Sequence, residues 1–598
     1  MKKLLLLIMV VALLPCVAFP QTLADVTKAI KGDTLVIKDY TDYGNKANSL
    51  YIAMLADTLS VPAGRVYELM ANGFFPLANN PSSSAAHKTV IVGSDARMLV
   101  KNADALSAPP LITGNVGSSV NQGAVNAGGD LTIKNCNLVP AASDGSLAWA
   151  YTGTSASNLH IVYDNCLFER TRWIFLAGFN EHCDMTFRNC YFVNMNGQPC
   201  RRNGGVLDSF QPQDSVVVEN CTHIMAQGSM YKWRDHTINR IIVNHNTFIN
   251  CAGYIFMDLG YQSNTSLTNN IFINSNIQAY PAMHSIDDGE QDLDWLPMGL
   301  VNVYPDSADV ATATKRKFLV QDNLAYWDPY LNDMISTLNT THINSVTNWK
   351  SQMIVANART DSMFKHLGRF SGSVYSYLNM DTWKTALPTF TDPKNLFTTT
   401  SGGALNALKT FALATVDTSS LGAVLLADWR LVNIGPAYYV YSDWPIPVNL
   451  AYNDAALLTA GLGGYPLGDL NWFPTQKAAW QLQRATELQR IANAMNAGTL
   501  VSVSGRPTGL PGTFELEQNY PNPFNPSTKI DFTIPTSGPV QLKVYNVLGE
   551  EVATLVNETL ALGKHSVTFN ASKLASGVYL YKITAGSFVS TMKMVLLK

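Results

Sequence analysis

Residues 125–275 contain a repeated segment whose period constrains the fold more than any other feature of the chain. Each copy ends in a short polar turn with one marker residue. The markers are Cys136, Cys166, Cys190, Cys221, Asn246 and Asn270, with a weaker seventh copy at Asn323. Successive full copies are 30, 24, 31, 25 and 24 residues apart. A period near 25 residues predicts a solenoid, because one coil cannot bury its apolar side alone and stacked coils share a core.

The residues around each marker are alike from copy to copy. Directly before it stand Asn135, Asn165, Asn189, Asn220, His245 and Asn269. Two positions after it stand Leu138, Phe168, Phe192, His223, Phe248 and Phe272. Apolar residues flanking a polar turn fit short strands better than helices. In parallel coils about 4.8 Å apart, like side chains lie over one another. We therefore expect an asparagine ladder in left-handed turns and an internal aromatic stack.

The cysteines are also arranged by the repeat. Seven follow Cys16, and four of these seven occupy the marker column. An exported chain could form disulfides. An odd number cannot all pair, however, and stacked side chains run parallel, which is poor disulfide geometry. We therefore predict buried, reduced thiols that pack as small apolar groups.

Composition agrees with a chain dominated by sheets and turns. Hydrophobic residues make up 47% and charged residues 14%, against about 25% charged in an average soluble domain. Asn, Ser, Thr, Gln and Gly must supply much of the polar surface. The net charge of −3 and the lack of a basic stripe argue against a nucleic-acid partner. The length of 598 residues suggests several folding units.

The repeat pattern resembles the right-handed parallel β-helix of the pectate-lyase-like superfamily. The resemblance covers about residues 85–330 and concerns the fold, since no catalytic motif comes with it. The predicted fold class is all-β dominated. A strand-rich cap over residues 25–84 precedes the β-helix, and a mixed region over 331–501 follows it, with further coils and a capping helix. This helix is predicted to begin at Pro474 and to end at Gly498. Its apolar residues at helical spacing are Leu482, Ala485, Leu488, Ala492 and Met495.

Residues 1–24 are typical of a signal peptide, with two lysines, an apolar run over 4–14 and small residues near the end. The run of 11 residues is shorter than the roughly 20 that span a bilayer as a helix. Cys16 could suggest a lipid anchor, but Pro15 precedes it where a small residue is needed. We expect export and a mature protein without a transmembrane segment.

After a linker over residues 502–513, residues 514–598 show alternating patterns that predict an Ig-sized β-sandwich. Four segments, at 519–524, 544–549, 576–579 and 593–598, closely resemble the type A C-terminal sorting domain of the type IX secretion system of Bacteroidetes-like bacteria. The resemblance implies the secretion machinery as partner and delivery across the outer membrane, to the cell surface or the medium. The alternative is an ordinary β-sandwich that contacts carbohydrate or protein.

One charged cluster could form a catalytic site. In the β-helix polysaccharide lyases, a basic residue generally removes a proton next to a uronate carboxylate. A calcium ion or a second basic residue neutralises the charge of that carboxylate. Three successive coils carry the candidates Arg202, Asp208, Lys232, Arg234, His236 and Asp258. Stacking could bring them onto one outer face, but a register error of one residue would turn a side chain inward. The alternative is a set of solvated surface charges.

A second candidate is an acidic loop that could bind calcium. Its carboxylates are Asp287, Asp288, Glu290, Asp292 and Asp294. Five carboxylates in eight residues are suitable oxygen ligands, yet their spacing fits no calcium-loop motif that we can state. A solvated acidic loop is the alternative. The chain has no Walker loop, nucleophile elbow or HExxH zinc motif.

Two functional hypotheses follow, and the sequence does not separate them. In the first, an exported β-helix protein binds an extracellular polysaccharide and could cleave it as a lyase or glycoside hydrolase. In the second, the protein is a non-enzymatic surface adhesin or envelope component. Whether the chain is an enzyme is left open.

Overall fold

The computed structural model describes most of the chain from residue 22 to residue 597. The described ranges are 22–57, 61–62, 64–94, 108–114, 124–140, 150–171, 173–195, 203–260, 262–280, 292, 294–305, 316–342, 348–372, 375–414, 432–434, 440–442, 444–501, 515–534, 538–560, 563–585 and 588–597.

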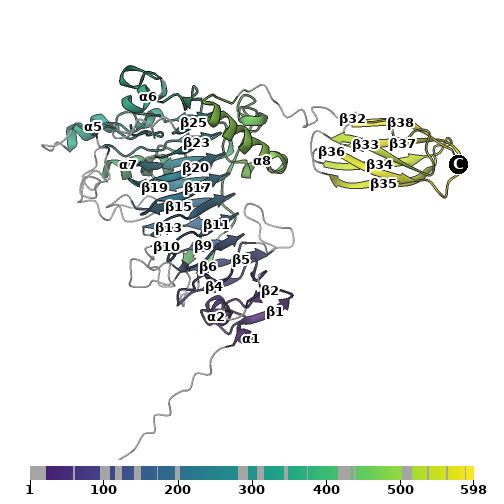
Figure 1. Ribbon diagram of the computed structural model, residues 1–598, viewed down its shortest axis with the longest axis horizontal. Helices are drawn as coiled ribbons and strands as arrows, with labels where there is room; N and C mark the ends of the chain where they lie inside the picture. Colours follow the sequence, from purple (N-terminus) through teal and green to yellow (C-terminus); the bar gives the residue numbers. More distant parts are fainter. Residues whose placement is uncertain are drawn as a thin grey trace, which may run out of the picture.

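Three sheets of stacked coils form a parallel β-solenoid (Figure 1), as predicted. Sheet A comprises β1 (Thr27–Lys31), β2 (Thr34–Ile37), β3 (Val66–Met70), β5 (Thr89–Ser94), β8 (Leu131–Lys134), β11 (His160–Asp164), β14 (Asp184–Arg188), β17 (Gln213–Glu219), β20 (Ile238–Asn244), β23 (Asn264–Thr268), β25 (Lys317–Gln321) and β27 (Leu378–Met380). Sheet B comprises β4 (Phe74–Pro76), β6 (Leu111–Thr113), β9 (Asn137–Val139), β12 (Leu167–Glu169), β15 (Tyr191–Met195), β18 (Thr222–Ala226), β21 (Thr247–Cys251), β24 (Ile271–Ile273) and β26 (Leu324–Tyr326). Sheet C comprises β7 (Val125–Ala127), β10 (Ala150–Thr154), β13 (Ile174–Gly178), β16 (Gly205–Ser209), β19 (Tyr231–Arg234) and β22 (Phe256–Asp258).

The coils extend beyond residues 85–330 at both ends. The strand β2 already pairs in parallel with β3, and β25 pairs in parallel with β27. Within the predicted cap, the antiparallel β1–β2 pair lies at the first end of sheet A. The coils therefore begin inside the region that we predicted to be a cap, because its strands alternate in burial and stack like the later ones.

The turn between sheets A and B has the predicted asparagine ladder. Its residues have positive φ angles: Asn135 56°, Asn165 53°, Asn189 55°, Asn220 56°, His245 53° and Asn269 61°. Side chains link neighbouring coils: the Asn165 amide donates to Asn135 Oδ1 at 2.9 Å, and the Asn220 amide to Asn189 Oδ1 at 2.7 Å. Asparagine tolerates this left-handed backbone, and its amide can bond along the stack.

The marker column lies inside the coils. The described cysteines are buried and form no disulfide. Above Cys221 the column continues as asparagines, whose side-chain oxygens accept from the backbone of the preceding coil: Cys221 N donates to Asn246 Oδ1 at 2.9 Å, and Asn246 N donates to Asn270 Oδ1 at 2.9 Å. This pairing satisfies polar atoms that have no access to water.

The predicted aromatic stack is also present. Ring centroids are 4.6 Å apart between Phe168 and Phe192, 4.9 Å between Phe192 and His223, 4.1 Å between His223 and Phe248, and 4.9 Å between Phe248 and Phe272. The planes of neighbouring rings are nearly parallel, with an angle of at most 14° in each pair. One continuous core therefore runs through the coils.

The described chain also contains helices and two small antiparallel strand pairs outside the three sheets. The helices are α1 (Leu23–Val26), α2 (Ser49–Ala56), α5 (Met334–Thr341), α6 (Ala358–Phe364), α7 (Ala404–Ala414) and α8 (Pro474–Ala497), with 3-10 turns η2 (Pro329–Leu331), η3 (Gly368–Phe370), η6 (Leu462–Gly464) and η7 (Leu470–Trp472). Two antiparallel pairs are β28 (Phe390–Asp392) with β31 (Asn449–Tyr452), and β29 (Val432–Ile434) with β30 (Val440–Ser442).

The helix α8 has the predicted ends but a different position and a different buried face. It begins at Pro474, and Gly498 follows it with a φ of 64°. It lies along the side of the solenoid, against β23 and β25, and not across its end (Figure 1). Leu482, which we predicted on the apolar face, is 86% exposed, whereas Trp480 and Glu487 are buried. The helix is oriented by polar contacts to the coil turns, which helical spacing of apolar residues does not reveal.

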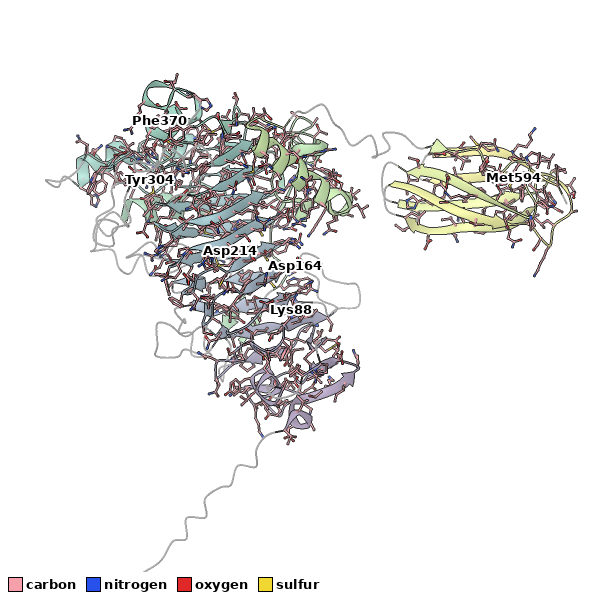
Figure 2. All side chains as sticks on the ribbon, viewed as in Figure 1. Lys88, Asp164, Asp214, Tyr304, Phe370 and Met594 are labelled. Atoms are coloured by element: carbon pink, nitrogen blue, oxygen red, sulfur yellow. The ribbon has the colours of Figure 1, made fainter. Side chains whose placement is uncertain are left out.

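The C-terminal segment is a β-sandwich of antiparallel strands, as predicted. One sheet joins β32 (Glu515–Leu516), β33 (Ser527–Ile534) and β36 (Gly563–Asn570), and the other joins β35 (Glu551–Leu560), β34 (Gly538–Tyr545), β37 (Gly577–Ala585) and β38 (Phe588–Leu596). It has its own apolar core, which includes Met594, labelled in Figure 2.

Candidate functional site

Sheet C brings four of the predicted site residues together. In the register of β16, β19 and β22, Asp208 pairs with Lys232, Lys232 with Met257, and Arg234 with Asp258. A bulge between Lys232 and Arg234, where Arg234 has a φ of 51°, shifts this last pairing by one residue. Such bulges redirect a side chain relative to its strand.

Asp208 and Arg234 form a two-pronged ion pair between adjacent coils. The guanidinium donates from Nε to Oδ1 at 2.6 Å and from Nη2 to Oδ2 at 2.9 Å. The Trp173 indole donates to Oδ2 at 3.2 Å. Asp208 is fully buried, whereas the Arg234 side chain is 26% exposed. The buried carboxylate therefore holds the arginine in one orientation at the surface.

Three aromatic rings lie beside this ion pair, and the sequence analysis missed them. The rings of Phe179 and Phe210 stack at 5.4 Å, and Trp173 meets Phe210 edge-on at 5.5 Å. The Arg234 guanidinium lies over the Phe210 ring, 4.4 Å from its centroid. Phe179 and Phe210 are half-buried. We call Trp173, Phe179, Phe210, Asp208 and Arg234 the aromatic–arginine face.

The position of the two phenylalanines follows from the coil register. Gly178 pairs with Ser209, so the next residue in each coil falls in the same column. The spacing of 31 residues between Phe179 and Phe210 equals the spacing between the markers Cys190 and Cys221. A search for aromatic residues that recur with the marker spacing could therefore have found this pair.

Asp258 is a buried carboxyl group on the last strand of sheet C. Burial raises its pKa to about 7, although hydrogen bonds from Gln262 and Gly260 and the charges of Arg316 and Arg359 oppose this. The Gln262 amide donates to Oδ1 at 3.0 Å. A carboxyl group with a pKa near neutrality can act as a general acid or base.

The other predicted catalytic residues differ in exposure. Lys232 is 1% exposed. The His236 side chain is 31% exposed, and its Nε2 lies 3.6 Å from Oδ1 of the neighbouring Asp235. Arg202 lies outside the described residues. The coil stacking therefore gathers Asp208, Lys232, Arg234 and Asp258 on one sheet, but it buries Asp208, Lys232 and Asp258, which we expected on an exposed outer face.

The predicted calcium ligand Asp292 is fully buried and bound by an arginine. Arg359 donates to Oδ1 at 3.1 Å and to Oδ2 at 2.6 Å, and it also reaches Asp294 at 2.7 Å. Its guanidinium lies 4.3 Å from the centroid of the Tyr304 ring, labelled in Figure 2. Because arginine supplies the positive charge here, the surroundings of Asp292 do not fit a calcium ion. Asp287 and Asp288 lie outside the described residues, and in the described part no group of three metal-binding side chains occurs.

Comparison with known proteins places one part of the chain. Residues 518–597 match the family described as secretion system C-terminal sorting domain. No curated protein and no solved structure matches the chain. In the parts that the structure describes, none of the helices has the length and apolar character needed to cross a membrane.

The sandwich and its motifs agree with this match. The alternation of buried and exposed residues in β33, β34 and β37 is that of a small two-sheet domain. Residues 518–597 are therefore a C-terminal sorting domain of the type IX secretion system, which implies secretion across the outer membrane to the cell surface or the extracellular space.

Proposed function

We propose that this exported β-helix protein binds an extracellular polysaccharide on sheet C, through the aromatic–arginine face. The observation that supports the proposal is the half-buried Phe179–Phe210 pair next to the surface-exposed edge of Arg234. A sugar ring presents one flat C–H face and a rim of hydroxyls. Aromatic rings with a few fixed polar groups are the usual complement of such a ligand.

The fixed arginine strengthens this argument. Asp208 and the Phe210 ring hold the guanidinium from two sides, so little side-chain entropy remains to be lost on binding. The pairing with Asp208 also neutralises most of its charge. The face is therefore suited to hydroxyl-rich chains and does not require an acidic one.

Binding is tested with the purified full-length chain on a panel of bacterial, algal and plant polysaccharides, by affinity electrophoresis and calorimetry. Replacing Phe210 by Ala should weaken binding about tenfold, since truncation of a central aromatic contact typically costs more than about 1 kcal/mol. Leu482→Ala is the matched control, because Leu482 is 86% exposed on α8. Equal binding by the Phe210→Ala, Phe179→Ala and control variants would remove the proposal.

Cleavage is a second function that one observation favours: the raised pKa of Asp258. As a base, Asp258 would lose activity as the pH falls below about 7, and Asp258→Asn would abolish turnover but keep polysaccharide binding. Release of unsaturated or reducing ends, measured with and without calcium, tests this. Lys232 and Asp258 are both buried, at 1% and 4% exposed, so burial does not separate the two candidates.

A non-enzymatic role on the cell surface competes with cleavage. The ion pair of the buried Asp208 with Arg234 joins two coils, which is the contact a rigid display scaffold requires. Such a scaffold predicts adhesion without any turnover. Binding that depends on Phe210 in the absence of any released product would favour it.

A further inference from the structure

A groove lies between α8 and the outer surface of sheet A, on a different sheet from the aromatic–arginine face. Its volume is about 470 Å³, and it is lined by β20, β23, β25 and α8. Sites for small molecules typically enclose roughly 300–1,000 Å³. We call it the α8 groove. Its lining includes no residue of the repeat's marker column and no residue of the charged cluster on sheet C.

One side of the α8 groove is apolar. Leu488, Ile491 and Met495 lie on the face of α8 that turns toward the sheet, and Ile242 of β20 lies opposite. Ile491 is anchored, because it is 3% exposed and packs with Leu319 of β25. The wall is therefore held rigidly in place before any ligand binds.

The groove also carries three cations: Arg240, Lys317 and Arg484. Arg484 forms an ion pair with the buried Glu219, with Nε 2.5 Å from Oε2, and shares this carboxylate with Arg188. Lys317 donates to the Asn496 side chain at 2.5 Å, and Arg240 is exposed. In the described part of the chain, neither Arg240 nor Lys317 has a carboxylate within ion-pair distance, and none of the described lining residues is acidic.

The register places the two unneutralised cations near the same edge of the sheet. Asn264 pairs with Lys317, and Ile241 pairs with Thr265, so Arg240 stands beside Asn264 in the neighbouring coil. Two positive charges beside an apolar wall attract an anion more strongly than they would in open water, because the wall lowers the local dielectric.

We propose that the α8 groove binds a small organic anion with an apolar body, such as a medium-chain carboxylate. The carboxylate would lie between Arg240 and Lys317, and the hydrocarbon part would pack along Leu488 and Met495. The site is independent of the polysaccharide face, so either proposal can fail without the other.

Octanoate, at concentrations where it stays monomeric, is titrated into the purified full-length chain by calorimetry, with acetate and octan-1-ol as partial ligands. Octanoate should bind more tightly than either partial ligand. Relative to acetate, the gain should be about fourfold for each fully buried methylene. Arg240→Gln and Lys317→Gln should each weaken it about fivefold, and added salt should weaken it further.

Arg490→Gln is the matched control, since it removes the same charge from α8 at a residue that does not line the groove. The melting temperature of each variant confirms that it is folded. Octanoate affinity that is the same in Arg240→Gln, Lys317→Gln and Arg490→Gln would overturn the proposal. Binding of galacturonate oligomers but not of octanoate would overturn it as well.

Discussion

His223 is the one titratable residue in the column of stacked rings. It is fully buried between Phe192 and Phe248, and burial lowers its pKa to about 3. Its Nδ1 lies 3.2 Å from the Thr247 carbonyl oxygen, and Nε2 lies 2.9 Å from the Tyr231 hydroxyl. A carbonyl can only accept, so Nδ1 carries the proton and Nε2 accepts from Tyr231. The folded protein therefore holds a neutral imidazole.

This burial makes stability depend on pH. The unfolded chain protonates His223 near its ordinary pKa of about 6.5, whereas the folded chain does not until about pH 3. The stability that comes from keeping His223 neutral is complete above pH 6.5. It is lost as the pH falls from 6.5 to 3, by about 1.4 kcal/mol per pH unit. His223→Phe fits the column and cannot titrate. When the pH is lowered from 8 to 5, we expect the free energy of unfolding of His223→Phe to rise by about 2 kcal/mol relative to that of the wild type.

Chemical denaturation at both pH values measures the effect. His223→Phe leaves the Tyr231 hydroxyl without its acceptor, at a cost of about 1–3 kcal/mol that does not change with pH. The comparison is therefore between the two pH values for each protein. A difference between wild type and variant that is the same at pH 5 and pH 8 would contradict the assignment.

Single residues of this kind were predictable where a coil repeats and not where distant segments meet. The left-handed asparagines and the stacked rings depend on register alone, which the spacing of the markers reveals. The Phe179–Phe210 pair also recurs with the marker spacing, whereas the Asp208–Arg234 pair depends on a bulge in β19. A shift of one residue moves a side chain across the sheet, so this ion pair lay beyond pattern analysis.

The segment from η6 to α8 binds the coil turns, and here the ladder residues have a second use. Asn269 Oδ1 accepts from Leu462 N at 2.8 Å, and Asn220 Oδ1 accepts from Leu470 N at 2.5 Å. The helix α8 then passes back along sheet A, where Arg484 meets Glu219 and Glu487 meets Asn244. Several coils are thereby fastened from outside. The sequence located the helix but not its attachment to the coils. The polar residues of α8 that make these contacts would be expected on a solvent-exposed face.

Glu487 is a buried residue of α8 that contacts Asn244 and His245 of the coils. Burial alone would raise its pKa, but the charge of His245 and hydrogen bonds from His245, Asn244 and Trp480 lower it. The ionised carboxylate therefore stabilises the fold above about pH 4.5, and this contribution is lost as the pH falls through its lowered pKa. Glu487→Ala should destabilise the protein by about 3–5 kcal/mol, because it leaves His245 buried without its partner.

Hydrogen exchange along α8 provides the measurement. Glu487→Ala should speed exchange throughout the helix and in the turns at Asn220 and Asn269, whereas Leu482→Ala, on the exposed side, should change little. Unchanged protection in Glu487→Ala would show that the apolar contacts of Ile491 and Leu319 are sufficient to hold the helix.

At the scale of the whole molecule, the core inside the coils and the core of the sorting domain are separate among the residues that the structure describes. The core of the coils runs from Val26 to Leu378, whereas the core of the sorting domain contains residues between Leu516 and Leu596. Every strand of the sandwich sheets comes from residues 515–596. Each part buries its own apolar residues and satisfies its own backbone, so each should unfold as a cooperative unit.

Removal of residues 514–598 should therefore leave the calorimetric transition of the β-helix unchanged and abolish only the transition of the sandwich. Leu542→Asp, which places a charge at a fully buried position of β34, should have the same effect in the intact chain. In a host with a type IX system, both variants should fail to reach the outside of the cell, while polysaccharide binding measured in vitro should be retained. A downward shift of the β-helix transition in both variants would instead show that the sorting domain supports the coils directly, and delivery and binding could then not be assigned to separate parts of the chain.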